Sequence, residues 1–164
     1  MIAKPYNVLF LCTANSARSI LAEAILNHRA KGAFKGYSAG SHPAGSVRPE
    51  ALLQLALAGI STAGLRSKSW NEFSAPGAPA MHFVFTVCDR AAQEICPLWP
   101  GQPMTAHWGI PDPAAQTGSE REIDRAFRAA FTVLDRRINL FLALPLSALS
   151  RIAIQREIED IGRR

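Results

Sequence analysis

The chain has 164 residues, of which 48% are hydrophobic and 19% charged, so we expect one globular domain with a sizeable core. Its net charge of +5 suits an anionic small substrate or simply a solvated basic surface. No run of Lys or Arg and no basic-aromatic alternation indicates nucleic-acid binding. The apolar stretch 138–149 is interrupted by Asn139 and Pro145 and is too short to cross a bilayer.

The cysteine content and the first residues bear on the compartment. Three cysteines are an odd number, which argues against a secreted disulfide framework. The first residues carry no charged segment followed by a long apolar core, so we predict no signal peptide. We therefore expect a cytoplasmic protein with neither a membrane nor a nucleic acid as partner.

Apolar runs and helical periodicity predict alternating elements along the chain. The expected strands cover residues 6–11, 34–39, 82–87 and 104–108. The expected helices cover residues 20–31, 49–59, 91–95, 119–144 and 147–161. Ser119, followed by Glu122 three residues later, resembles a capping box, and Pro145 ends that helix.

Strands that alternate with helices predict an α/β fold, namely a single-domain three-layer sandwich with a central four-stranded parallel sheet flanked by helices. Residues 1–144 would form the domain proper, and residues 145–164 a C-terminal helical extension of the same domain. In such sheets ligands bind at the carboxyl ends of the strands. Cys12, Cys88 and the loop beyond Trp108 all follow strands, so we expect them at one edge of the sheet.

The stretch 8–19 joins a buried strand to a helix through a short loop that begins with Cys12. Backbone N–H groups converge before a helix N-terminus, so such a loop suits an oxyanion. N–H groups and cations lower the pKa of a nearby thiol, which predicts a thiolate nucleophile at Cys12. Arg18 can grip two oxygens of a phosphate or arsenate. A buried core cysteine beside a helix-start arginine is the alternative.

Asp112 lies between Pro111 and Pro113, which hold its carboxyl group on a stiff loop. A bound oxyanion would raise the pKa of this carboxyl group, and Asp112 could then donate a proton to the departing oxygen. The alternative is an ordinary Asp-Pro turn.

Two further cysteines, Cys88 and Cys96, are eight residues apart, the first at a strand end. They could be independent core residues. They could also bind zinc with His82 or His107, although the spacing matches no common zinc pattern.

The loop Cys12–Ser19 resembles the anion-binding loop of the low-molecular-weight tyrosine phosphatases and of the arsenate reductases related to them. The resemblance covers residues 5–143 and implies a single parallel α/β domain. The segment 107–114 is similar to the His-Trp-Gly…Asp-Pro-Ala segment of the arsenate reductases. The tyrosine phosphatases typically carry an aromatic residue after Asp-Pro, where this chain has Ala114.

The resemblance to arsenate reductases implies a relay of three cysteines. Cys12 would attack arsenate with help from Asp112, and Cys88 would then attack Cys12 and release arsenite. Cys96 would take over Cys88, leaving a disulfide that a thioredoxin-type partner reduces. Two thiols that become a disulfide supply the two electrons that As(V) needs. The residues expected to bind the oxyanion are Thr13, Ala14, Asn15, Ser16, Ala17, Arg18 and Ser19.

Two other functions stay open. A low-molecular-weight phosphotyrosine or phosphomonoester phosphatase would use Cys12, Arg18 and Asp112 alone, through a phosphocysteine at Cys12. A non-catalytic oxyanion-binding or regulatory domain is the other alternative, against which the complete Cys12, Arg18 and Asp112 set argues.

The loop also departs from the family pattern. Ala14 stands where Gly is usual, at a position that could demand a positive φ. The resemblance also implies a potassium site near the loop, because some arsenate reductases of this type use an Asn and a Glu for it. In this chain Asn15 and Glu23 stand at those positions. Because Arg66 or Lys68 could serve as a built-in cation, we predict neither a metal nor a cofactor. Asn15 and Ser19 are expected to brace the loop.

Overall fold

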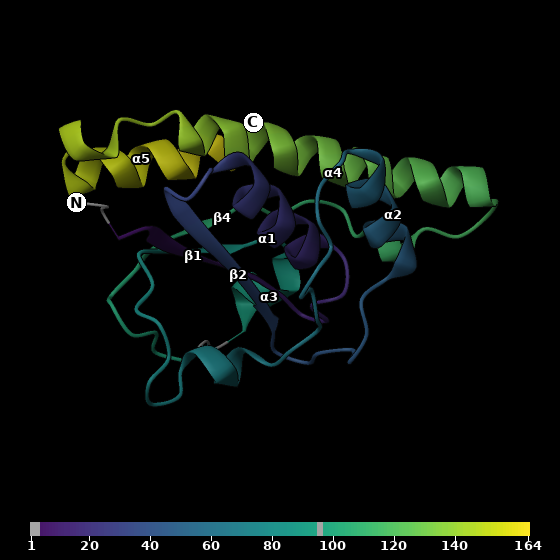
Figure 1. The fold of residues 1–164 in the computed structure, drawn as a ribbon, viewed down its shortest axis with the longest axis horizontal. Coiled ribbons are helices and arrows are strands. Elements are labelled where there is room, and N and C mark those ends of the chain that lie inside the picture. The colour runs from purple at the N-terminus through teal and green to yellow at the C-terminus, as the bar shows by residue number, and fades with distance from the viewer. Residues whose placement is uncertain (1–3, 95–96) are drawn as a thin grey trace.

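The computed structural model describes residues 4–94 and 97–164, so Cys96 lies outside the described residues (Figure 1). The strands are β1 (Tyr6–Cys12), β2 (Phe34–Gly40), β3 (Phe83–Thr86) and β4 (Met104–His107). The α-helices are α1 (Arg18–Arg29), α2 (Pro49–Leu57), α3 (Asp89–Gln93), α4 (Glu120–Leu142) and α5 (Arg151–Ile161). Short 3-10 helices are η1 (Trp70–Phe73), η2 (Pro113–Ala115) and η3 (Leu146–Ala148).

The four strands form one parallel sheet in the order β2-β1-β3-β4. Cys12 pairs with Gly40 on one neighbouring strand, and Leu11 pairs with Thr86 on the other. This register brings the carboxyl ends of the strands to one edge, which is the edge where parallel sheets bind ligands.

Two layers cover the sheet, and together with it they form the predicted three-layer sandwich. Helices α1 and α4 cover one face, where a buried aromatic cluster lies among Phe10, Phe85, Trp108 and Phe141. The opposite face is smaller and is covered by η1 and by loop residues such as Met81 and Trp99. The alternation of residues along β1 explains both faces, because Phe10 points to one layer while Leu9 and Leu11 point to the other.

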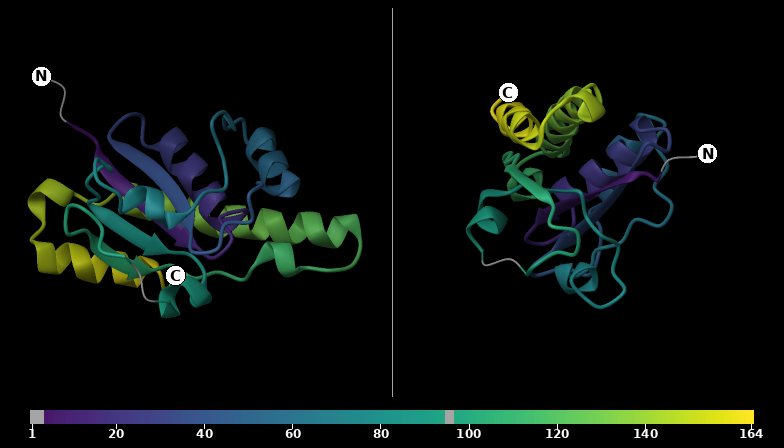
Figure 2. Two further views of the ribbon diagram at one scale, coloured as in Figure 1. Left: turned by 90° about the horizontal axis from the view of Figure 1, so that it is seen from below. Right: turned by 90° about the vertical axis from the view of Figure 1, so that its left-hand side faces the viewer.

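The last two long helices begin at side-chain caps. Ser119 and Glu122 form the predicted capping box at the start of α4. Helix α5 begins at Arg151, where Ser150 caps it, rather than at residue 147, because η3 occupies the turn after Pro145. Helix α5 then runs back alongside α4 and packs against the edge strand β4 (Figure 2).

Candidate active site

The loop between β1 and α1 turns its carbonyl groups outward. Three of these carbonyls accept N–H groups of segment 42–48 at 2.9 Å, namely those of Thr13, Ala14 and Ser16. In a trans peptide the next N–H points opposite to the carbonyl, so the loop N–H groups face the other side. The N–H of Asn15 accordingly donates to Cys12 Sγ at 3.2 Å. The loop thus directs backbone donors toward the sulfur, as an oxyanion site requires.

The close approach of the loop to β2 depends on Gly40. A Cβ atom at this position would collide with the carbonyl oxygen of Thr13 and lie 3.0 Å from the N atom of Asn15. The loop does contain a positive φ, but it falls at Asn15, at 48°, and not at Ala14. The concern raised by Ala14 was therefore wrong, because Asn tolerates the left-handed region that the loop needs.

A chain of hydrogen bonds orients the hydroxyl of Ser19 toward Cys12. The backbone N–H of Lys68 donates to Asn15 Oδ1 at 2.9 Å, which fixes the side-chain amide. Asn15 Nδ2 then donates to Ser19 Oγ at 2.7 Å. The Ser19 hydroxyl is left to donate to Cys12 Sγ, 2.8 Å away. Asn15 and Ser19 brace the loop as predicted, and Ser19 in addition contacts the sulfur of Cys12.

The pKa of Cys12 differs from the expectation. Burial raises the pKa of the Cys12 thiol, and the hydrogen bonds from Ser19 and Asn15 offset this only in part. The prediction of a lowered pKa is therefore wrong for the free protein. The reason is that burial of the sulfur outweighs the hydrogen bonds it accepts, while the Arg18 guanidinium contacts Ile110 and Asp112.

Arg18 links the loop to the segment that carries Asp112. Its Nη1 donates to the carbonyl of Ile110 at 3.0 Å, and its Nη2 lies 3.5 Å from Asp112 Oδ2. Asp112 caps η2 by accepting the N–H of Ala114 at 3.0 Å. The structure thus brings Cys12, Arg18 and Asp112 to one sheet edge, as the sequence predicts.

Cys88 joins the same edge from the end of β3. Its sulfur lies 3.6 Å from Thr13 Oγ1 and accepts the N–H of Ala91 at 3.3 Å, which caps α3. Cys88 and Cys12 are both buried free thiols, and a negative charge on Cys88 would further raise the pKa of Cys12. The third predicted cysteine, Cys96, lies outside the described residues.

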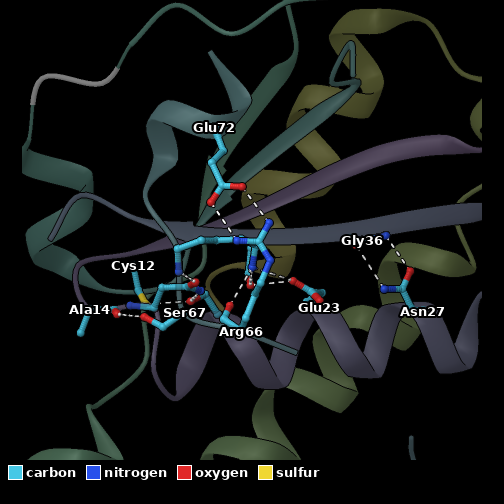
Figure 3. A network of polar contacts seen from close by, with 12 residues as sticks. Cys12, Ala14, Glu23, Asn27, Gly36, Arg66, Ser67 and Glu72 are labelled. Atoms are coloured by element: carbon cyan, nitrogen blue, oxygen red, sulfur yellow. Dashed lines mark hydrogen bonds and ion pairs between the residues drawn. The ribbon is translucent and has the colours of Figure 1, made fainter. Parts of the chain in front are cut away.

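Lys68 places a buried cation behind the loop. Its ammonium group donates to Arg66 O at 2.9 Å and to Ser38 Oγ at 3.3 Å, and it lies 3.5 Å from Glu23 Oε1. The side chain of Arg66 instead pairs with Glu72 (Figure 3). Of the two candidate cations, Lys68 is therefore the one that lies among these oxygens. Because its ammonium group occupies the space between them, they leave no open site for potassium.

Sequence reasoning missed three contributors to the site. Gly40 was noted only as a strand end, although it lets the loop approach β2. Ser67 supports the loop by donating to Ala14 O at 3.1 Å (Figure 3). The carbonyl of Ile110 orients Arg18. The one sequence feature that could have revealed Gly40 is that it pairs with Cys12 across the sheet. This pairing can be recognised only once the register of the two strands is known.

The described residues contain neither a membrane-spanning helix nor a cluster of metal-ligating side chains. No helix among them is long and apolar enough to cross a membrane. No three His, Cys, Asp or Glu side chains of the described residues are placed to hold a metal ion.

Comparisons with known proteins agree with this geometry. The model of the low molecular weight phosphotyrosine protein phosphatase family matches residues 7–154. An arsenate reductase of Shouchella clausii is 33% identical over 134 residues, covering 82% of this chain and 93% of the relative.

Two solved structures share the fold. An arsenate reductase in its phosphate-binding state superimposes with a TM-score of 0.69 at 25% identity, over 84% of this chain and 97% of the other. A thioredoxin-dependent arsenate reductase of Corynebacterium glutamicum gives a TM-score of 0.57 at 26% identity, over 85% of this chain and 65% of the other. Because the family model matches most of its residues, the chain belongs to the low-molecular-weight phosphotyrosine protein phosphatase family.

Proposed function

We propose that this protein reduces arsenate to arsenite through a relay of three cysteines. The observation that carries the proposal is the position of Cys88, whose sulfur packs against the oxyanion loop 3.6 Å from Thr13 Oγ1. Hydrolysis of a phosphate ester needs only one sulfur, whereas reduction of As(V) needs two electrons from two thiols. The similarity to curated arsenate reductases supports the same function.

The first step is attack of Cys12 on a bound arsenate. The thiol passes its proton to an oxygen of the bound arsenate dianion, and the N–H of Asn15 and the Ser19 hydroxyl then stabilise the thiolate. The sulfur forms a bond to arsenic while an arsenate oxygen leaves. Asp112 donates a proton to this oxygen, which departs as water, and Arg18 holds the remaining oxygens.

The second step transfers two electrons. The thiolate of Cys88 attacks the sulfur of Cys12, and the S–As bond breaks with its electron pair going to arsenic. Arsenic leaves as arsenite, As(III), and Cys12 and Cys88 remain joined in a disulfide. Helix α3 must loosen in this step, because Cys88 caps it. The helix has five residues, so few hydrogen bonds oppose the movement.

The third step restores Cys12. Cys96 attacks Cys88, Cys12 leaves as a thiolate, and a dithiol reductant of the thioredoxin type reduces the Cys88–Cys96 disulfide. The thioredoxin dependence of the C. glutamicum reductase supports this choice of partner. We assign the reaction to the cytoplasm, where such reductants keep thiols reduced.

A phosphatase that works through a Cys12 phosphocysteine is the second candidate. The family description and the shared Cys12, Arg18 and Asp112 geometry favour it. Against it, Ala114 offers no aromatic ring after the Asp-Pro pair. Weak phosphatase activity would be compatible with arsenate reduction, because both reactions begin with the same attack.

The test measures arsenate-dependent oxidation of thioredoxin by the wild type, Cys88→Ser and Cys96→Ser. The relay predicts that both variants lose turnover of arsenate, while hydrolysis of an aryl phosphate changes little because Cys12, Arg18 and Asp112 are kept. Full arsenate turnover in either variant would exclude the relay. Robust hydrolysis with no arsenate turnover in the wild type would favour the phosphatase.

A further inference from the structure

The segment that leads from β4 to Asp112 is held by the last helix of the chain. This segment, residues 107–110, ends two residues before Asp112 and supplies the carbonyl that orients Arg18. On its inner side it continues the pairing with β3, through Trp108 N to Thr86 O at 2.7 Å and Ile110 N to Val87 O at 3.2 Å. Its outer side faces α4 and α5.

Arg137 of α4 connects the segment to the end of α5. Its guanidinium is buried, with 7% exposure, and it donates to main-chain oxygens. Nη1 donates to Trp108 O at 2.8 Å and to Gly109 O at 3.3 Å, while Nε donates to Arg164 O at 3.1 Å. These main-chain oxygens partly compensate for burial of the guanidinium, which lowers the pKa of Arg137.

Helix α5 also contacts the segment directly. The indole N–H of the fully buried Trp108 donates to Ile158 O at 2.9 Å. Gly162 packs so closely that a Cβ atom there would collide with the carbonyl of His107 and lie 2.9 Å from Trp108. The backbone of Gly162 has a φ of −65°, so this position requires a glycine for close packing and not for its conformation.

We propose that Arg137 and the end of α5 form a brace that positions Asp112, with Arg137 as a positioning residue and not a catalytic one. The proposal rests on the proposed function only in taking Asp112 as the proton donor. The family model ends at residue 154, so Ile158, Gly162 and Arg164 lie beyond the matched region. The brace therefore makes the segment 145–164 part of the domain that carries the site.

The first test needs no activity. Hydrogen–deuterium exchange of residues 104–114 is measured in Arg137→Gln and Gly162→Ala, with the exposed neighbour Arg136→Gln as the matched control. The brace predicts faster exchange of the amides at 108–110 in the first two variants and wild-type exchange in the control. Unchanged exchange in Arg137→Gln and Gly162→Ala would overturn it.

The second test asks whether the brace acts through Asp112. Arsenite formation is measured as kcat/KM for each variant in the wild-type and Asp112→Asn backgrounds, at a temperature where melting curves show all of them folded. If Asp112 loses its position, kcat/KM should decrease about tenfold in the wild-type background. This is a part of the ~10²- to 10⁴-fold rate acceleration that general acid catalysis supplies. In the Asp112→Asn background the same substitutions should change kcat/KM by less than about twofold, because coupled residues are not additive.

The outcomes separate the two proposals. An equal decrease in both backgrounds would show that the brace supports the fold and not Asp112, and would overturn the inference. If the wild type forms no arsenite, the proposed function fails. The same variants in the two backgrounds are then compared by their kcat/KM for phenyl phosphate, whose poor leaving group also needs a proton donor. The inference again requires a decrease in the wild-type background and little change in the Asp112→Asn background.

Discussion

Ser19 is the main side chain that favours ionisation of the buried Cys12 thiol. Burial raises the pKa of Cys12 above its ordinary value of 9.0, and the hydrogen bond from Ser19 opposes that rise. In Ser19→Ala the donor is lost while the side chain stays small. We expect the pKa of Cys12 to rise further and the thiolate fraction at neutral pH to fall.

The measurement is the pH dependence of Cys12 alkylation by iodoacetamide, followed by mass spectrometry. The midpoint should lie above pH 9.0 in the free wild type and higher still in Ser19→Ala. Ser147→Ala, at an exposed position in η3, is the matched control and should leave the midpoint unchanged. A midpoint below 9.0 in the wild type would show that the loop lowers the pKa of the thiol after all.

Asp112 can be tested with little disturbance to its loop. Asn keeps the oxygen that accepts the N–H of Ala114 but has no acidic proton to donate. We expect Asp112→Asn to lower kcat/KM for arsenate by about 10²- to 10⁴-fold, as the loss of a general acid does. Steady-state arsenite formation measures this, and a change below about threefold would remove Asp112 from the role of proton donor.

At the level of the elements, Lys68 ties the loop before η1 to α1 and β2. Its side chain and that of Glu23 are only 7% and 13% exposed, so solvent screens their attraction little. Lys68→Met would leave the Glu23 carboxylate buried without its cation. Breaking a buried ion pair in this way costs about 3–5 kcal/mol.

Urea unfolding compares Lys68→Met with Lys35→Met, which changes an exposed lysine. The first variant should lose about 3–5 kcal/mol of unfolding free energy, and the second little. In a second variant, Lys68→Ala, the short side chain leaves the oxygens that contacted the ammonium group open to a bare cation. Potassium chloride should therefore restore more of the unfolding free energy of this variant than choline chloride does. A loss below about 1 kcal/mol in Lys68→Met would show that the pair contributes little.

Local patterns predicted the elements well, because periodicity and caps are properties of neighbouring residues. The four strands, the capping box at Ser119 and the meeting of Cys12, Cys88 and Asp112 at one edge all followed from them. The start of α5 was predicted too early, because the pattern of apolar residues does not distinguish the short 3-10 helix η3 from the first turn of α5.

What the sequence did not reveal depends on contacts between distant residues. The roles of Gly40 and Gly162 lie in close approaches that only the assembled fold creates. The pKa of Cys12 was predicted in the wrong direction because it is raised by burial of the sulfur, which depends on how distant elements pack around it. Burial and partner choice are tertiary properties, so spacing alone cannot give them.

Taken as a whole, the molecule places two buried thiols at the carboxyl ends of neighbouring strands, beneath one oxyanion loop. In the proposed relay, the sulfur of Cys88 attacks the sulfur of Cys12 and arsenite is displaced. The net charge of +5 favours the approach of an anion without selecting arsenate over phosphate. The choice between the two therefore depends on whether Cys88 reacts.

A single-turnover experiment with Cys96→Ser tests that reaction most directly. Without Cys96 the relay should stop after the second step, so the protein is mixed with arsenate in the absence of reductant and then quenched. Mass spectrometry should find a Cys12–Cys88 disulfide together with one arsenite released per chain. Absence of that disulfide, with no arsenite released or with both thiols still free, would contradict the relay.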